Sequence, residues 1–107
     1  MLINPRRGEI SAVLGGAERR LCLTLGALAQ LERDLAAGDL QSLAQRFSSG
    51  RVSADDLITI LHAGLVGGGN ALTREDVADL DCEDGLAGYA AIAAQLLEAA
   101  FGPADEA

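Results

Sequence analysis

The apolar positions begin with an alternating region and continue as segments that recur every three or four residues. From Gly8 to Leu14, every second residue is apolar (Ile10, Ala12, Leu14), which places these side chains on one side of an extended strand. Gly15-Gly16 suits a tight turn with positive φ. The returning segment places Leu21, Leu23 and Leu25 inward, and Arg20, Cys22 and Thr24 outward. The pattern predicts a β-hairpin over residues 8–25, and its apolar face must pack on helices because a lone hairpin is marginal in water.

The clearest helical pattern runs from Ser53 to Val66. Ser53 followed by Asp56 has the outline of a capping box, and Asp55 and Asp56 suit the positive end of the helix dipole. The apolar positions then follow a 3.6-residue period: Leu57, Ile60, Leu61 and Leu65. Gly67-Gly68-Gly69 predicts the end of the helix and a flexible turn, since a helical glycine loses much conformational entropy. These glycines lack the Lys-Ser/Thr of a P-loop.

Four further segments predict helices. Thr24 can cap a helix that Gly38 ends, with an apolar stripe of Leu25, Leu28, Leu31 and Leu35. Asp39 can cap a shorter helix, closed by residues 48–50, that presents Leu40, Leu43, Ala44 and Phe47. Thr73 repeats the capping outline before Val77 and Leu80. A last helix over residues 86–101 directs Tyr89, Ile92, Leu96 and Leu97 toward the core, and Gly102-Pro103 stops it.

These elements predict an α+β fold that is mostly helical, with an N-terminal β-hairpin packed on about five short helices. At 107 residues the chain is expected to form a single domain over 1–107. Within it we expect a flexible arm (1–7), the hairpin (8–25), the helical part (25–101) and a tail (102–107). With two Phe, one Tyr and no Trp, the core is built from small aliphatic side chains.

The charge is divided unevenly along the chain, whose formal net charge is −8. Residues 1–51 carry seven arginines and five acids, whereas residues 52–107 carry one arginine and eleven acids. The acidic half argues against nucleic acid or an anionic membrane as the main partner. No apolar run approaches the roughly 20 residues that span a bilayer, and the N-terminus lacks the apolar segment of a secretory signal. We therefore expect a cytoplasmic protein.

No motif in the chain is typical of an enzyme, a metal centre or a cofactor site. The alternating acids Asp79, Asp81, Glu83 and Asp84 resemble the start of a calcium loop, but the sixth and twelfth positions are Asp84 and Ala90 instead of Gly and Glu. A solvated acidic turn is favoured. His62, the single histidine, lies among apolar residues and is interpreted as a partly buried helical residue. Cys22, in a strand, and Cys82, in a loop, are expected to be free thiols.

Several segments together resemble a known family: Asn4-Pro-Arg-Arg-Gly-Glu, Leu23-Thr-Leu-Gly-Ala-Leu-Ala-Gln-Leu-Glu, Phe47-Ser-Ser-Gly-Arg and Asp56-Leu-Ile-Thr-Ile-Leu-His-Ala-Gly-Leu. The chain resembles the small tail protein of bacterial gene transfer agents, which is grouped with phage tail assembly chaperones. The resemblance covers about residues 4–101.

This resemblance implies a non-enzymatic role in the producing cell. The protein would bind the tape measure protein, keep it soluble and help tail tube protein subunits to polymerise around it; it could also form a homo-oligomer. Some members are labelled tail tube proteins, so the alternative is a structural head-tail or tail tube component retained in the particle. A tube subunit of the long-tailed phage type uses a many-stranded β-sandwich or barrel. Because one hairpin is predicted here, the chaperone is the favoured hypothesis.

A chaperone of this kind needs an apolar groove for a client helix and charges that keep the empty form soluble. We place the groove at the C-terminal end of the central helix, with Leu65, Val66 and Leu72 exposed around the glycines; the alternative is that all three are core residues. The acids Glu75, Asp76 and Asp79 are a second candidate contact, for basic client segments.

Overall fold

A computed structural model describes residues 8–35, 42, 45 and 52–101. Two strands are followed by four helices in the described part of the chain: β1 (Glu9–Leu14), β2 (Ala17–Cys22), α1 (Leu25–Asp34), α3 (Ala54–Gly67), α4 (Arg74–Ala78) and α5 (Gly85–Phe101). The predicted α+β class with an N-terminal hairpin is confirmed, with four helices described where about five were expected. The helix expected after Asp39 lies outside the described residues, apart from Ser42 and Gln45, which are helical. The arm (1–7) and the tail (102–107) also lie outside them.

The hairpin closes through the predicted two-glycine turn. Leu14 pairs with Ala17, and Gly15 and Gly16 have φ values of 64° and 77°. Both values are positive, as a type I′ turn requires, and this turn matches the twist of antiparallel strands. Leu14 and Leu21 are buried on the inner face, as the alternation predicts. The backbone N–H of Gly15 also donates to the carbonyl of Asp81 at 2.8 Å, which fixes the tip against the loop between α4 and α5.

The prediction for Leu25 is wrong, because its side chain is 81% exposed. β2 ends at Cys22, and Thr24 caps α1 by accepting a hydrogen bond from the N–H of Ala27. Leu25 is therefore the first helical residue and no longer part of the strand alternation. At about 100° per residue it also lies roughly 90° around α1 from the middle of the stripe formed by its other leucines. Those leucines are buried as predicted: Leu28, Leu31 and Leu35.

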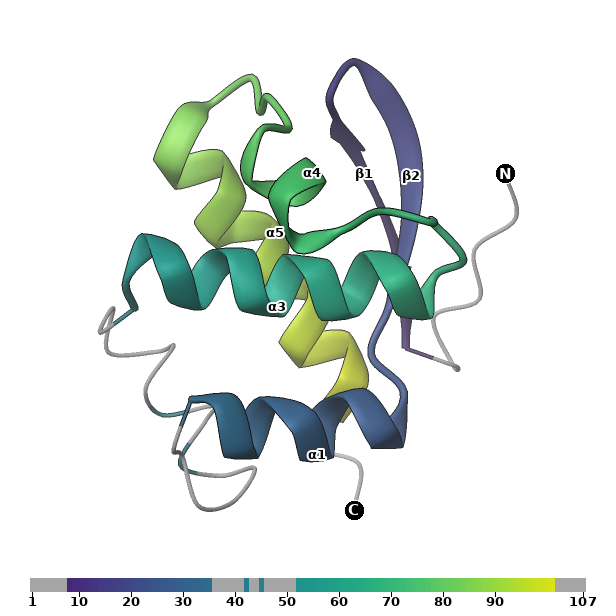
Figure 1. The fold of residues 1–107 in the computed structure, drawn as a ribbon, viewed down its shortest axis with the longest axis vertical. Coiled ribbons are helices and arrows are strands. Elements are labelled where there is room, and N and C mark those ends of the chain that lie inside the picture. The colour runs from purple at the N-terminus through teal and green to yellow at the C-terminus, as the bar shows by residue number, and fades with distance from the viewer. Residues whose placement is uncertain (1–7, 36–41, 43–44, 46–51, 102–107) are drawn as a thin grey trace.

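Helix α3 is the central element of the fold. In Figure 1 it runs between α1 and α4 and crosses in front of α5, and its C-terminal end reaches β2. Both predicted capping boxes form, Ser53 with Asp56 at α3 and Thr73 with Asp76 at α4. The predicted apolar face of α3 is buried along its length: Leu57, Ile60, Leu61 and Leu65. At Gly64, a Cβ would lie 2.3 Å from Cδ2 of Leu96, so α3 and α5 cross closely.

On α5, Leu96 and Leu97 are buried, whereas Tyr89 and Ile92 are half-buried and pack against the core. Ala93 is fully buried as well, and it was not among the predicted core positions. The hydroxyl of Tyr89 donates a hydrogen bond to the carbonyl of Leu80, which joins α5 to the end of α4. In the described residues, no helix is both long enough and apolar enough to cross a membrane.

Candidate functional site

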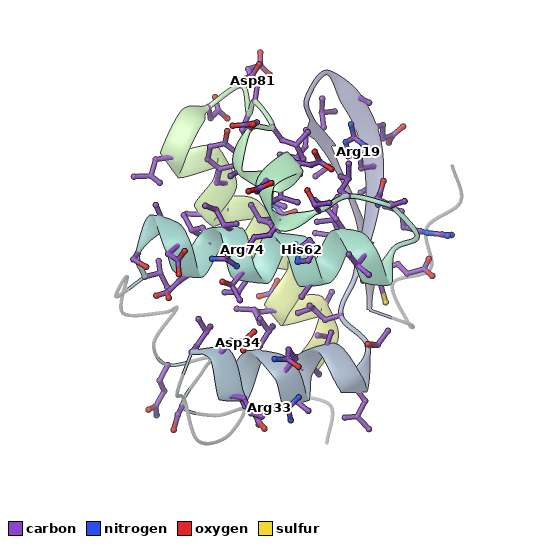
Figure 2. All side chains as sticks on the ribbon, in the orientation of Figure 1. Arg19, Arg33, Asp34, His62, Arg74 and Asp81 are labelled. Atoms are coloured by element: carbon purple, nitrogen blue, oxygen red, sulfur yellow. The ribbon has the colours of Figure 1, made fainter. Side chains whose placement is uncertain are left out.

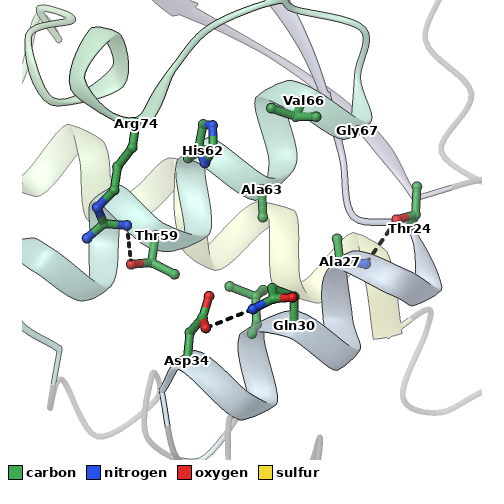
Figure 3. Close-up of a pocket in the computed structure, with 11 residues that line it drawn as sticks. Thr24, Ala27, Gln30, Asp34, Thr59, His62, Ala63, Val66, Gly67 and Arg74 are labelled. Carbon is green, nitrogen blue, oxygen red and sulfur yellow. Dashed lines mark hydrogen bonds between the residues drawn. The ribbon is translucent and has the colours of Figure 1, made fainter.

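A pocket of about 560 Å³ opens between α1 and α3. Figure 3 shows that the facing sides of these two helices form its walls, and that the side chain of Arg74 reaches in from the start of α4. From α1 and its cap, the lining residues are Thr24, Ala27, Gln30, Leu31 and Asp34. From α3 they are Thr59, His62, Ala63, Val66 and Gly67. Each set follows helical spacing, so the walls are one face of each helix.

The pocket wall is made mainly of small and apolar groups. Ala27 and Leu31 lie one turn apart on α1, and Ala63 lies on the facing side of α3 (Figure 3). Val66 stands at the end of this wall with 52% of its surface exposed. An exposed valine beside alanines forms an apolar hollow. An apolar side chain of a partner that fills it is favoured, since each buried CH₂ contributes about 0.8 kcal/mol.

Polar groups form the rim near the start of α3. Nη1 of Arg74 donates to the hydroxyl of Thr59 at 2.7 Å, and Nη2 lies 2.5 Å from Oδ1 of Asp55. The Thr59 hydroxyl in turn donates to the Asp55 carbonyl at 3.0 Å. These bonds satisfy Thr59, the buried polar residue of the described core, and hold α4 against the first turn of α3. Because the side chains of Arg74 and Asp55 are 43% and 80% exposed, the ion pair adds little stability and serves mainly to position α4.

His62 faces the pocket and is half-buried, which confirms its interpretation as a partly buried helical residue. Its Nε2 lies 3.1 Å from the carbonyl oxygen of Leu72. A carbonyl only accepts, so Nε2 carries the proton in this hydrogen bond. The ring thus fastens the segment after the glycines to the middle of α3.

The structure separates the three residues of the predicted apolar groove. Leu65 is fully buried, so the expectation that it is exposed is wrong; it continues the core face of α3. Leu72 is half-buried and packs against the core. Val66 points away from the core and lines the pocket. The predicted groove at the end of α3 is therefore replaced by the pocket between α1 and α3, and only Val66 belongs to both.

Tight packing also explains the triple glycine, which is not an open turn. A Cβ on Gly67 would lie 2.0 Å from the carbonyl oxygen of Cys22, and one on Gly68 would lie 2.0 Å from that of Arg20. Asn70 then donates from Nδ2 to the Arg20 carbonyl at 2.8 Å. Gly67 and Gly68 are required because the end of α3 lies directly against the backbone of β2, and Gly69 has a positive φ of 96°.

The predicted acidic contact lies on α4, outside the pocket. Glu75, Asp76 and Asp79 are all exposed. Asp76 has a structural role as well, since its Oδ2 accepts from the N–H of Thr73 at 2.9 Å. Hydrogen bonds from the backbone and side chain of Thr73 lower the pKa of Asp76 below its ordinary value of 3.8. Contact of these acids with a partner stays a prediction.

The lowered pKa of Asp76 predicts a pH-dependent contribution to stability. The folded state favours the carboxylate, so this contribution is present above about pH 3.8 and is lost as the pH falls through the lower pKa of the folded state. We expect Asp76→Asn to lower Tm at pH 7, and we expect the difference from the wild type to shrink toward pH 2. Thermal melts followed by circular dichroism would measure this. A difference that is the same at both pH values would contradict the prediction.

The described residues include no group of three or more His, Cys, Asp or Glu side chains arranged to hold a metal ion. Cys22, at the end of β2, and Cys82, in the loop before α5, are thiols that form no disulfide, as predicted, and both are half-buried. Figure 2 shows His62 on α3 with the side chain of Arg74, from the start of α4, lying over the same helix, whereas Asp81 lies in the loop before α5.

Sequence reasoning missed the α1 wall of the pocket. Ala27, Gln30 and Asp34 follow a helical spacing beside the leucine stripe, and that spacing is also typical of an ordinary solvent-exposed face. The one available signal was Val66, an apolar residue on the polar side of α3. Which helix faces Val66 depends on tertiary packing, so the sequence did not identify α1 as its neighbour.

The fold and the pocket define a small α+β domain with an apolar hollow between two helices, a type of surface that suits protein–protein contacts. The chain belongs to the family described as phage tail tube protein, GTA-gp10, whose model matches residues 7–103. The predicted resemblance to a gene transfer agent tail protein is thereby confirmed, and the family is one of structural tail proteins and not of enzymes. No curated protein and no solved structure shows significant similarity to the chain.

Proposed function

We propose that this protein is a structural component of the tail of a phage-like gene transfer particle, acting through contacts with other tail proteins. The observation that carries the proposal is the match to the tail tube protein family over residues 7–103, a range that includes every described helix and strand. This is the alternative of the sequence analysis, and it now takes precedence over the chaperone. A tail protein works in the cytoplasm of the producing cell or in the particle, and the proposal favours the particle.

Quantitative mass spectrometry of purified particles tests this proposal. A tail component is expected at a fixed copy number relative to the other tail proteins, in several independent preparations. The producing-cell lysate, measured in parallel, shows whether the protein was made. Abundant protein in the lysate with none in the particles would overturn the proposal.

A tail assembly chaperone is the second candidate, and two observations favour it. The described part of the chain contributes one two-stranded hairpin, whereas a β-rich tube ring needs many strands. The α1–α3 pocket has the small apolar wall and exposed valine that a helix of a client protein can enter. In this role the protein would bind the tape measure protein and hold it ready for tube assembly.

The Val66→Asp substitution tests the chaperone role. A carboxylate at the end of the apolar wall is expected to weaken binding of a client helix about tenfold or more, since roughly 1.4 kcal/mol corresponds to a factor of ten. Co-expression with the tape measure protein, followed by measurement of its soluble and co-purified fractions, gives the readout. Leu86→Asp is the matched control: Leu86 is 67% exposed and lines a separate pocket of about 150 Å³. Equal co-purification of wild type and Val66→Asp would count against this use of the pocket.

The exposed acids of α4 give the chaperone role a second testable contact. If Glu75 and Asp79 meet basic client segments, the affinity for the tape measure protein is expected to fall as salt rises from about 50 to 500 mM. A Glu75→Gln, Asp79→Asn double variant is expected to lose most of this salt dependence. Affinity that does not change with salt would remove the acids from the proposed interface.

A further inference from the structure

The outer edge of β1 has no partner strand in the described part of the chain. In a hairpin with a two-residue turn, Leu14 and Ala17 exchange backbone hydrogen bonds, and the direction of these bonds alternates from residue to residue. Ile10, Ala12 and Leu14 therefore bond to β2, whereas the N–H and C=O groups of Ser11 and Val13 point outward. Among the described residues, no hydrogen bond from outside the hairpin reaches the backbone of Ser11 or Val13.

The opposite edge of the hairpin is covered. The Arg20 carbonyl on β2 accepts a hydrogen bond from Nδ2 of Asn70. The backbones of Gly67 and Gly68 lie against β2 so closely that neither position has room for a Cβ. The end of α3 therefore blocks β2, and a further strand can add to the hairpin only along β1.

Between Ser11 and Val13, β1 lacks several features that usually protect an edge strand; the loop before α5 meets the hairpin at its tip, where the Gly15 N–H donates to the Asp81 carbonyl. The sequence of β1, Glu-Ile-Ser-Ala-Val-Leu, contains no lysine or proline, and its register is continuous, without a bulge. Val13 is 61% exposed on the outer face. The charges of the hairpin cancel, with Glu9 and Glu18 against Arg19 and Arg20, although the whole chain carries −8. Two copies can therefore approach each other through their hairpins without the repulsion that their acidic surfaces impose elsewhere.

We propose that two copies of this chain associate through β1, in an antiparallel pair centred on Ser11. The two hairpins would then form one four-stranded sheet in the order β2-β1-β1-β2. Ser11 faces Ser11 of the second copy, and the outward N–H of each serine donates a hydrogen bond to the outward C=O of the other. A two-fold axis passes between the two serines, so the interface is closed and self-complementary.

This register suits both faces of the sheet. On the inner face it sets Ile10 opposite Ala12 of the second copy, which extends the apolar surface. On the outer face it sets Glu9 opposite Val13 of the second copy, so no two like charges stand directly opposite each other. The association uses the isolated protein alone, and its test is independent of whether the protein stays in the particle.

Cysteine cross-linking tests the register. In a Cys22→Ser, Cys82→Ser background, Ser11→Cys is expected to form a disulfide-linked dimer under oxidised glutathione, because the facing Cα atoms of such a pair lie about 5.5 Å apart. Val13→Cys is the matched control, since its thiol faces Glu9 of the second copy and is expected to stay monomeric. Equal cross-linking of the two variants, or none with Ser11→Cys, would overturn the proposed pairing.

Mass measurement in solution tests the association itself. In sedimentation of the wild type, the average molecular mass is expected to rise from 11.0 kDa toward twice that value as the protein concentration increases. Ser11→Pro removes an outward N–H and is expected to weaken the dimer at least tenfold, whereas Ser11→Ala retains the N–H and is expected to dimerise. Val13→Glu, which keeps the backbone intact and sets a second carboxylate opposite Glu9 of the second copy, is also expected to weaken the dimer and guards against misfolding of the proline variant. A wild type that stays at 11.0 kDa at concentrations up to about 1 mM would overturn the proposal.

Discussion

The Leu65→Asp substitution is expected to remove a large part of the stability of the fold. Leu65 is fully buried on the core face of α3, and its replacement both removes an apolar side chain and leaves a carboxylate without a partner. We expect a loss of about 4–5 kcal/mol, against a total stability of roughly 5–15 kcal/mol for a domain of this kind. Urea unfolding followed by circular dichroism would measure the loss.

The next residue provides the control for this prediction. Val66→Asp places the same charge on a side chain that is 52% exposed, and it is expected to change the free energy of unfolding by only about 0.5 kcal/mol. Comparison of Leu65→Asp with Val66→Asp therefore separates a folding defect from a binding defect at adjacent positions. If Leu65→Asp unfolded at the same urea concentration as the wild type, the assignment of Leu65 to the core would be wrong.

The Gly68→Ala substitution is expected to destabilise the fold by about 3 kcal/mol, which corresponds to a fall in Tm of roughly 12–24 °C. The added Cβ would lie 2.0 Å from the carbonyl oxygen of Arg20 and 3.0 Å from the Cα of Leu21. Both are backbone atoms, so a side-chain rotation cannot relieve the clash. α3 would have to move away from β2, which would also strain the hydrogen bond from Asn70 to Arg20.

Gly26→Ala is the matched control, because Gly26 is an exposed residue in the first turn of α1. A Cβ there would approach only the Thr24 hydroxyl, at 3.9 Å. The substitution is expected to raise the free energy of unfolding by about 0.5–1 kcal/mol, since alanine loses less conformational entropy in a helix. Differential scanning calorimetry of both variants would provide the comparison. Similar Tm values for Gly68→Ala and the wild type would contradict the close approach of α3 to β2.

Local patterns predicted the parts of the fold that local chemistry decides. The two-glycine turn needs positive φ, the capping boxes use residues three apart, and the core face of α3 follows from the helical period alone. The prediction for Leu25 was wrong because this residue fits both a strand alternation and a helical stripe. The N-cap at Thr24 makes Leu25 the first helical residue. A cap is a local feature, so this boundary was readable from the sequence, and with it the position of Leu25 beside the leucine stripe.

The candidate site was less predictable because it depends on distances between segments that are far apart in sequence. Leu65 and Val66 are adjacent and both apolar, yet one is in the core and the other lines the pocket. The glycines at the end of α3 favoured a flexible turn, since a Gly-rich segment gives no indication of what lies against it. The position of β2 explains why Gly67 and Gly68 lack side chains.

The contact between the hairpin tip and the loop before α5 has a consequence for how the chain folds during synthesis. The N–H of Gly15 donates to the carbonyl of Asp81, so this hydrogen bond can form only after the chain has been synthesised as far as Asp81. The inner face of the hairpin likewise packs on α3 and α5, so it remains without its neighbours until those segments leave the ribosome. A nascent chain in which α5 is incomplete would hold an incompletely packed hairpin, so the fold can be completed only after α5 has been synthesised.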